Sequence, residues 1–156
     1  MNRTRVLIAL LVTLLVRPSL IGQTPSASPV TKIRGDKVTL EISAQSQPTR
    51  APVALKWDVY FPAQLMEIEA DPEPGSAAKD SGKMLNCTTR RLYAYSCTLS
   101  GGQNPIADGL IAIYHFKIKA TAEAGTTRFK IEQVRSTTAD TKETILSSTE
   151  AIVMIK

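Results

Sequence analysis

Apolar and polar residues alternate along most of the chain, which is the pattern of β-strands packed on one side. The longest such stretch without a breaker runs from Gly109 to Ala120. One side of this predicted strand is apolar throughout: Leu110, Ala112, Tyr114, Phe116 and Ile118. The other side starts apolar and ends basic: Ile111, Ile113, His115, Lys117 and Lys119. We therefore expect a long strand with its first side in the core and its second side facing outward.

Shorter strands are predicted before and after this one. The clearest is Val53 to Phe61, which Pro62 ends because proline cannot donate to a strand ladder. Its predicted core side is Val53, Leu55, Trp57, Val59 and Phe61, and its predicted outward side is Ala54, Lys56, Asp58 and Tyr60. Further strands are expected at residues 38–42, 65–70, 83–99, 126–134, 145 and 151–155, with a turn at 71–75 and a bulge or strand end near Val134.

No helical period of useful length follows the N-terminal region, and turn signals separate the short strands. This arrangement favours an all-β fold, a two-sheet β-sandwich of about nine strands. The final run, Ala151 to Ile155, is apolar at every position. We expect it to lie between other strands, buried on both sides.

The two cysteines, Cys87 and Cys97, belong to one predicted hairpin. The register that keeps Leu85, Cys87, Tyr95 and the other apolar residues on one side places Cys87 opposite Cys97 and Leu85 opposite Leu99. A disulfide is therefore expected, with two separate buried thiols as the alternative.

The N-terminus predicts export. Arg3 and Arg5 precede the apolar run Val6 to Val16, which suits a signal peptide better than a membrane span. We expect a signal peptide at residues 1–22, a linker at 23–36 and one domain at 37–156. Cleavage after Gly22 or Ala27 and an uncleaved membrane anchor both stay open. The protein is expected to be secreted, periplasmic or attached to the cell envelope, where a disulfide is stable.

Charge and residue chemistry favour binding over catalysis. The formal charge of +5 falls to +2 without Arg3, Arg5 and Arg17, and the basic residues form no stripe, so nucleic-acid binding is not expected. The single histidine, His115, has no acidic neighbour at a catalytic or metal-binding spacing. The acidic residues at 67, 69, 71 and 73 suit the solvent side of a strand and its turn better than paired catalytic carboxylates or calcium ligands. We expect no enzymatic activity, no metal and no cofactor.

A binding surface is predicted on the outward sides of two strands. If these strands share a sheet, they form one flat, partly apolar patch typical of protein recognition. Its residues are Lys56, Asp58, Tyr60, Ile111, Ile113 and His115. The alternative for the isoleucines is that a loop covers them. Only Tyr60 among the aromatic residues is clearly outward, which makes a stacking platform for sugars less favoured.

Several ordered motifs resemble the bacterial cohesin domain. They are the segment from Leu55 to Ile68, which includes Trp57-Asp-Val-Tyr-Phe-Pro, then Pro74-Gly75, the segment from Ile106 to Ala120, and Ala139 to Glu143. The likeness spans about residues 37–156. Phe61-Pro62 departs from the family's Tyr-Asp-Pro, and the cysteine pair is foreign to the best-known members.

The resemblance implies a nine-stranded jelly-roll sandwich that binds without catalysis. In that family one flat sheet face docks a dockerin, in the context of polysaccharide breakdown. Carried over by position, Asp58 resembles the polar residue of the recognition strand, and the strand at 109–120 its neighbour. We expect a dockerin-like or other protein partner, with a polysaccharide ligand or a structural role in the envelope as alternatives.

Overall fold

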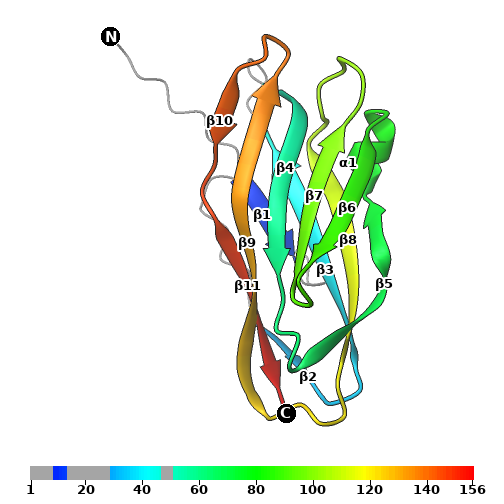
Figure 1. The fold of residues 1–156 in the computed structure, drawn as a ribbon, viewed down its shortest axis with the longest axis vertical. Helices are drawn as coiled ribbons and strands as arrows, with labels where there is room; N and C mark the ends of the chain where they lie inside the picture. The colour runs from blue at the N-terminus through cyan, green and yellow to red at the C-terminus, as the bar shows by residue number, and fades with distance from the viewer. Residues whose placement is uncertain (1–8, 14–28, 47–50) are drawn as a thin grey trace.

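The protein is a sandwich of two β-sheets, as predicted (Figure 1). The computed structural model describes residues 9–13, 29–46 and 51–156. The strands are β1 (Ala9–Thr13), β2 (Val30–Lys32), β3 (Lys37–Gln45), β4 (Pro52–Tyr60), β5 (Met66–Pro74), β6 (Met84–Arg90), β7 (Ala94–Ser100), β8 (Gly109–Ile118), β9 (Gly125–Thr138), β10 (Glu143–Ile145) and β11 (Thr149–Ile155). The nine strands β3 to β11 lie within the predicted domain at 37–156.

Sheet A and sheet B form the two layers. Sheet A has the order β1-β3-β8-β5. Sheet B has the order β2-β11-β9-β4-β7-β6, with β10 paired to β9. In Figure 1, β9, β4, β7 and β6 lie side by side in the near layer, and β3 and β8 lie behind them.

The core lies between the sheets and is built from the predicted inward sides of the strands. Trp57 of β4 and Tyr114 of β8 meet at its centre, and both are fully buried. The Trp57 Nε1–H donates to the Tyr114 hydroxyl oxygen at 2.8 Å. That hydroxyl lies 3.1 Å from the Cys97 Sγ and donates to it, because a disulfide sulfur carries no proton. This chain of contacts joins the two sheets.

The predicted hairpin register and disulfide are confirmed. Cys87 pairs with Cys97 and Leu85 with Leu99 between β6 and β7. The two cysteines form a disulfide. The bond ties β6, which is one of the two edge strands of sheet B, to β7, its only neighbour in the sheet order.

The prediction for Ile111 was wrong. Ser43 of β3 pairs with Leu110 and Ile42 with Ala112, so Ile111 is an extra residue in β8. Such a bulge breaks the alternation of the side chains. Ile111 is buried within the core together with Ala112, and does not face outward.

A short helix, α1 (Ser76–Asp80), was not predicted. Ala77 and Ala78 of α1 are buried in the core, and α1 contacts β8. The chain approaches β8 closely at Gly75, whose N–H donates to the Ile111 carbonyl at 3.0 Å. A Cβ at Gly75 would lie 2.3 Å from the Leu110 carbonyl oxygen, so only glycine fits at this close approach.

Two strand boundaries also differ from the prediction. Residues 71–74 continue β5 instead of forming a turn. Pro72 and Pro74 are tolerated because β5 is an edge strand of sheet A, where one side of the backbone needs no ladder partner. The bulge expected near Val134 is confirmed, because Gln133 and Val134 together lie opposite Trp57.

The final strand, β11, lies between β2 and β9 as expected. It is buried on one side only. Ile152 is half-buried and Met154 is exposed, so the prediction of burial on both sides was wrong.

The N-terminal segments enter the fold in an unexpected way. Ala9–Thr13, inside the predicted signal peptide, forms β1 against β3. Val30–Lys32, inside the predicted linker, forms β2 parallel to β11. The predicted cleavage sites at Gly22 and Ala27 lie outside the described residues. Within the described residues, no helix is long and apolar enough to span a membrane.

The buried hydrogen bond between the sheets makes a prediction for Tyr114→Phe. The substitution leaves the Trp57 N–H buried without its acceptor, which should lower the free energy of unfolding by about 1–3 kcal/mol. Urea unfolding at pH 7 measures the change. Tyr93→Phe on an exposed tyrosine is the control and should change stability little, and equal losses in the two variants would contradict the prediction.

Alkaline pH provides a second readout of Tyr114. Burial raises the pKa of the Tyr114 phenol well above its ordinary value. Above about pH 10 the unfolded chain therefore loses a proton that the folded chain keeps, so stability falls as pH rises, by at most about 1.4 kcal/mol per pH unit for one group. We expect a shallower fall in Tyr114→Phe, measured by urea unfolding between pH 9 and pH 11.

The disulfide makes a third prediction. Replacing both cysteines by serine should lower the free energy of unfolding by about 3 kcal/mol, because the loop that the bond closes gains entropy in the unfolded chain. Denaturant unfolding with and without a reductant measures this loss. The reductant should destabilise the wild type and leave the double variant unchanged. Free thiols in unreduced, denatured protein would contradict the pairing.

Candidate functional site

The six residues predicted as one binding surface do not form one surface. Lys56, Asp58 and Tyr60 are on β4 in sheet B, whereas Ile113 and His115 are on β8 in sheet A. The outward sides of the two sheets face opposite directions. The alternation in the sequence was correct for β4, but it could not show that β4 and β8 belong to different layers.

The β8 half of the predicted patch is narrow. Ile111 is buried, and Ile113 is half-buried between Glu41 of β3 and Glu73 of β5. His115 Nε2 lies 3.4 Å from Glu73 Oε1. This part of sheet A is therefore a strip between two carboxylate-bearing strands, and it has no broad apolar area.

The β4 half belongs to a continuous polar surface. We define the sheet B face as the outward side chains of β9, β4, β7 and β6. The strand registers place them in three rows across the sheet. The rows are Lys130, Tyr60, Ala94 and Arg90; Glu132, Asp58, Ser96 and Thr88; and Arg135, Lys56, Thr98 and Asn86.

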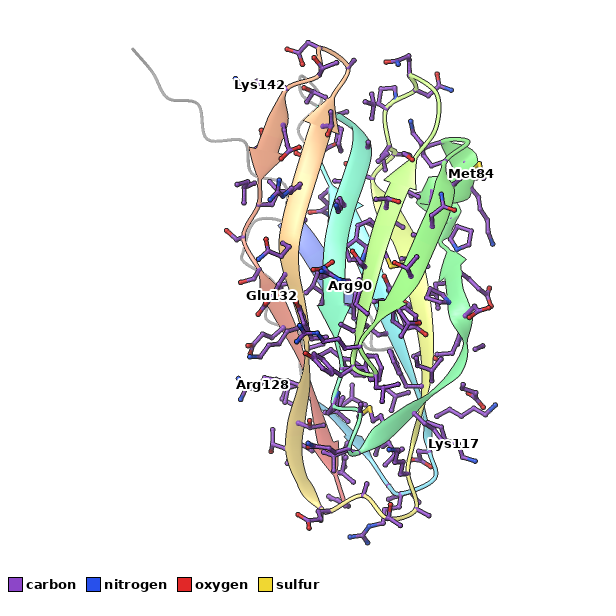
Figure 2. All side chains as sticks on the ribbon, viewed as in Figure 1. Met84, Arg90, Lys117, Arg128, Glu132 and Lys142 are labelled. Atoms are coloured by element: carbon purple, nitrogen blue, oxygen red, sulfur yellow. A yellow bond between two sulfur atoms is a disulfide. The ribbon has the colours of Figure 1, made fainter. Side chains whose placement is uncertain are left out.

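The sheet B face spans four adjacent strands of the near layer. Figure 2 shows Arg90 and Glu132 over these strands, with Arg128 below them on β9. The rows contain four basic side chains, at 56, 90, 130 and 135, and two acidic ones, at 58 and 132. Positive charge therefore predominates on this face by two.

Asp58 is the buried centre of the sheet B face. Its side chain is only 7% exposed, although it points away from the core. Arg90 Nη1 lies 3.4 Å from Asp58 Oδ2, and the Arg90 side chain is 62% exposed. The guanidinium thus covers the carboxylate and keeps its own outer side open to a ligand.

Other ion pairs lie at the margin of the sheet B face. Arg128 Nη1 is 3.0 Å from Glu150 Oε2, and Arg135 Nη1 is 2.9 Å from Glu143 Oε1. Both partners of each pair are substantially exposed. These pairs link β9 to β11 and to β10, and such exposed pairs contribute little to stability.

Tyrosines lie at one end of the sheet B face. The Tyr60 and Tyr93 rings stack with their centroids 6.3 Å apart. Both rings, with Arg90, Arg91 and Ala94, line a hollow of about 270 Å³. Beyond it, Leu92 at the β6–β7 turn is the most exposed large apolar side chain of the described residues. Met84 is also exposed, at the other end of β6 (Figure 2).

Arg90, Lys130, Glu132 and Arg135 were not identified from the sequence. The sequence predicts a loop over residues 89–93, whereas in the structure β6 continues to Arg90, which lies opposite Ala94. The sequence pattern could not show that β7 and β9 pair with β4. This pairing brings residues that are far apart in the chain into one surface.

The described residues do not gather three or more His, Cys, Asp or Glu side chains in a metal-binding arrangement. The acidic side chains at 67, 69, 71 and 73 follow β5 and are exposed, as expected for the solvent side of a strand. Glu69 pairs with Lys37 at 2.6 Å and Glu73 lies against His115.

Comparison with known proteins identifies the fold. No family model matches the sequence, and no curated protein matches it. Solved structures match with high coverage. The cohesin of a type I cohesin–dockerin complex from Clostridium thermocellum has a TM-score of 0.73 at 13% identity, over 96% of this chain and 99% of that one.

Two further similar structures come from other settings. The cohesin module of a family 33 glycoside hydrolase from Clostridium perfringens has a TM-score of 0.71 at 10% identity, over 96% of this chain and 98% of that one. A non-cellulosomal cohesin from the archaeon Archaeoglobus fulgidus has a TM-score of 0.66 at 9% identity, over 95% and 91%. The predicted cohesin-like jelly-roll fold is confirmed.

The burial of Asp58 makes a prediction for its ion pair. Arg90→Met leaves a buried carboxylate without its cation and should lower the free energy of unfolding by about 1–3 kcal/mol. Arg128→Met is the matched control, because it removes a similar pair whose carboxylate is exposed, and should cost below about 1 kcal/mol. Urea unfolding of both variants tests the difference, and equal losses would contradict it.

Proposed function

We propose that this chain is a non-catalytic binding module that recognises a protein partner of the dockerin type through the sheet B face. The observation that carries the proposal is the continuous polar surface across β9, β4, β7 and β6, with the buried Asp58 at its centre. The fold supports it, because similar cohesins were solved in complexes with dockerins. The resemblance of the motifs implies that Asp58 is the polar residue of the recognition strand, which supports the choice of this face.

The charge of the sheet B face indicates what the partner presents. Lys56 and Lys130 are exposed, and Arg90 and Arg135 are held in place by carboxylates. Complementary charge fixes the register and speeds association of two protein surfaces. The partner surface should therefore present carboxylates opposite Lys56 and Lys130, with apolar side chains toward Leu92 and Tyr93.

The module acts outside the cytoplasm in this proposal. Arg3, Arg5 and the apolar run after them are the features of an export signal, and the Cys87–Cys97 disulfide is typical of an oxidising compartment. A secreted, periplasmic or envelope location follows, and with it a role in holding a partner near the cell or near polysaccharide.

A carbohydrate is the second candidate ligand, favoured by one feature. The hollow between Tyr60, Tyr93, Arg90 and Arg91 combines aromatic rings with hydrogen-bond donors, which suits a sugar ring. Its small size fits one or two sugar units rather than a long chain.

Binding assays with purified dockerins and soluble polysaccharides test both candidates. We expect one or more dockerins to bind, and the double variant Lys56→Glu/Lys130→Glu to weaken that binding by about a hundredfold, as truncating or reversing central interface charges does. Lys117→Glu, an exposed lysine of sheet A, is the matched control and should bind as the wild type does.

Two results would contradict the proposal. One is equal weakening by Lys117→Glu and the double variant. The other is polysaccharide binding that Tyr60→Ala abolishes while no dockerin binds at all, which would establish the carbohydrate reading instead.

A further inference from the structure

Sheet A has two edges of opposite character. The β5 edge carries Pro72 and Pro74 together with carboxylates at 67, 69, 71 and 73. Prolines and charges are the usual devices that stop an edge strand from pairing with another chain. The β5 edge is therefore closed to further strands.

The other edge is built to accept a strand. β3 has no proline between Lys37 and Gln45, and its alternate residues Val38, Leu40, Ile42 and Ala44 are buried in the core. In this structure β1 fills the position beside it, antiparallel, with Ala9 opposite Gln45 and Thr13 opposite Glu41.

β1 does more than extend sheet A. It also contacts β11 of sheet B, so it lies along the side of the sandwich between the two sheets. Without β1, residues 41–45 of β3 lose the only ladder partner that the described part of the chain places on that edge.

The occupant of this position is the residue run that the sequence predicts to be removed. Ala9–Thr13 lies in the middle of the apolar run of the signal peptide. We propose that, once the signal peptide is removed, the β3 edge takes up an extended apolar strand from another polypeptide in place of β1. This inference rests on cleavage of the signal peptide, and it is independent of the sheet B face.

The geometry selects the occupant. A second copy could present its own β3 edge, but that strand is fixed in a sheet and cannot enter the space that β1 fills between β3 and β11. A free, extended segment can. Like β1, it should be apolar, antiparallel to β3 and about five residues long. It should contain no proline, because main-chain hydrogen bonds supply the affinity in strand addition. Pockets for alternate side chains supply the specificity.

The test uses the protein recovered after export, with its N-terminus determined by sequencing. The probe is a synthetic peptide Ala-Leu-Leu-Val-Thr flanked by lysines for solubility. We expect the peptide to bind and to raise the melting temperature. It should also slow amide hydrogen exchange by at least about tenfold at those amides of residues 41–45 that point away from β8.

Two N-methylated peptides make the test specific for a strand. One is methylated at the second and fourth residues, the other at the first, third and fifth. Alternate amides of an antiparallel strand face its neighbour, so one pattern should weaken binding by about tenfold or more and the other should change it little. Equal effects of the two patterns, whether both weaken binding or neither does, would show that binding does not depend on alternate amides and would overturn the proposal.

The remaining outcomes are also decisive. An exported chain that keeps residues 9–13 fills the position itself, which overturns the proposal without affecting dockerin binding. If those amides of residues 41–45 that point away from β8 already exchange slowly without the peptide, another part of the chain covers the β3 edge, with the same consequence. If the exported protein is unfolded, the peptide must restore folding; failure to do so also overturns it.

Discussion

The two sheets meet at the centre of the core in the buried hydrogen bond between Trp57 and Tyr114. The indole N–H and the phenol belong to different layers, and each is surrounded by apolar side chains. A hydrogen bond in such surroundings tolerates little displacement, because the alternative is an unpaired polar atom in the core. The Tyr114 hydroxyl also reaches Cys97, which links this contact to the disulfided hairpin. The contact therefore lies beneath the sheet B face and supports the alignment of β4 and β7 under it.

The sequence predicted local structure well and spatial neighbours poorly. Period-2 alternation identified the inward side of β4, and the parity of the apolar residues identified the register of Cys87 with Cys97. Neither pattern carries information on which strands pair across a sheet, so residues of β4 and β8 were grouped although they lie in different layers. Ile111 was misplaced for a second reason: one bulge residue reverses the alternation, and no residue type marks that bulge. Of the six residues predicted as one surface, Lys56, Asp58 and Tyr60 do lie together on β4 in sheet B.

Asp58 was predicted to point outward, and it does point away from the core, yet its side chain is buried. Its strand position directs it away from the core, but neighbours from three other strands surround it, and Arg90 closes over it. Such an arrangement keeps the middle of a polar surface rigid. Fewer side chains then need to be ordered when a ligand arrives, which reduces the entropy lost on binding.

The disulfide has a consequence for how the protein must be made. Arg90, the cover of Asp58, is the last residue of β6, and β6 is held to the rest of sheet B through β7 alone in the sheet order. In a reducing cytoplasm the hairpin would lack its covalent tie, and the edge strand would open more often than the layers behind it. Protein produced there would fray first at β6, and with it at the β6 side of the sheet B face. Protein for interaction screens should therefore be produced in an oxidising compartment. Otherwise a failure to bind can result from the missing disulfide and says nothing about the partner.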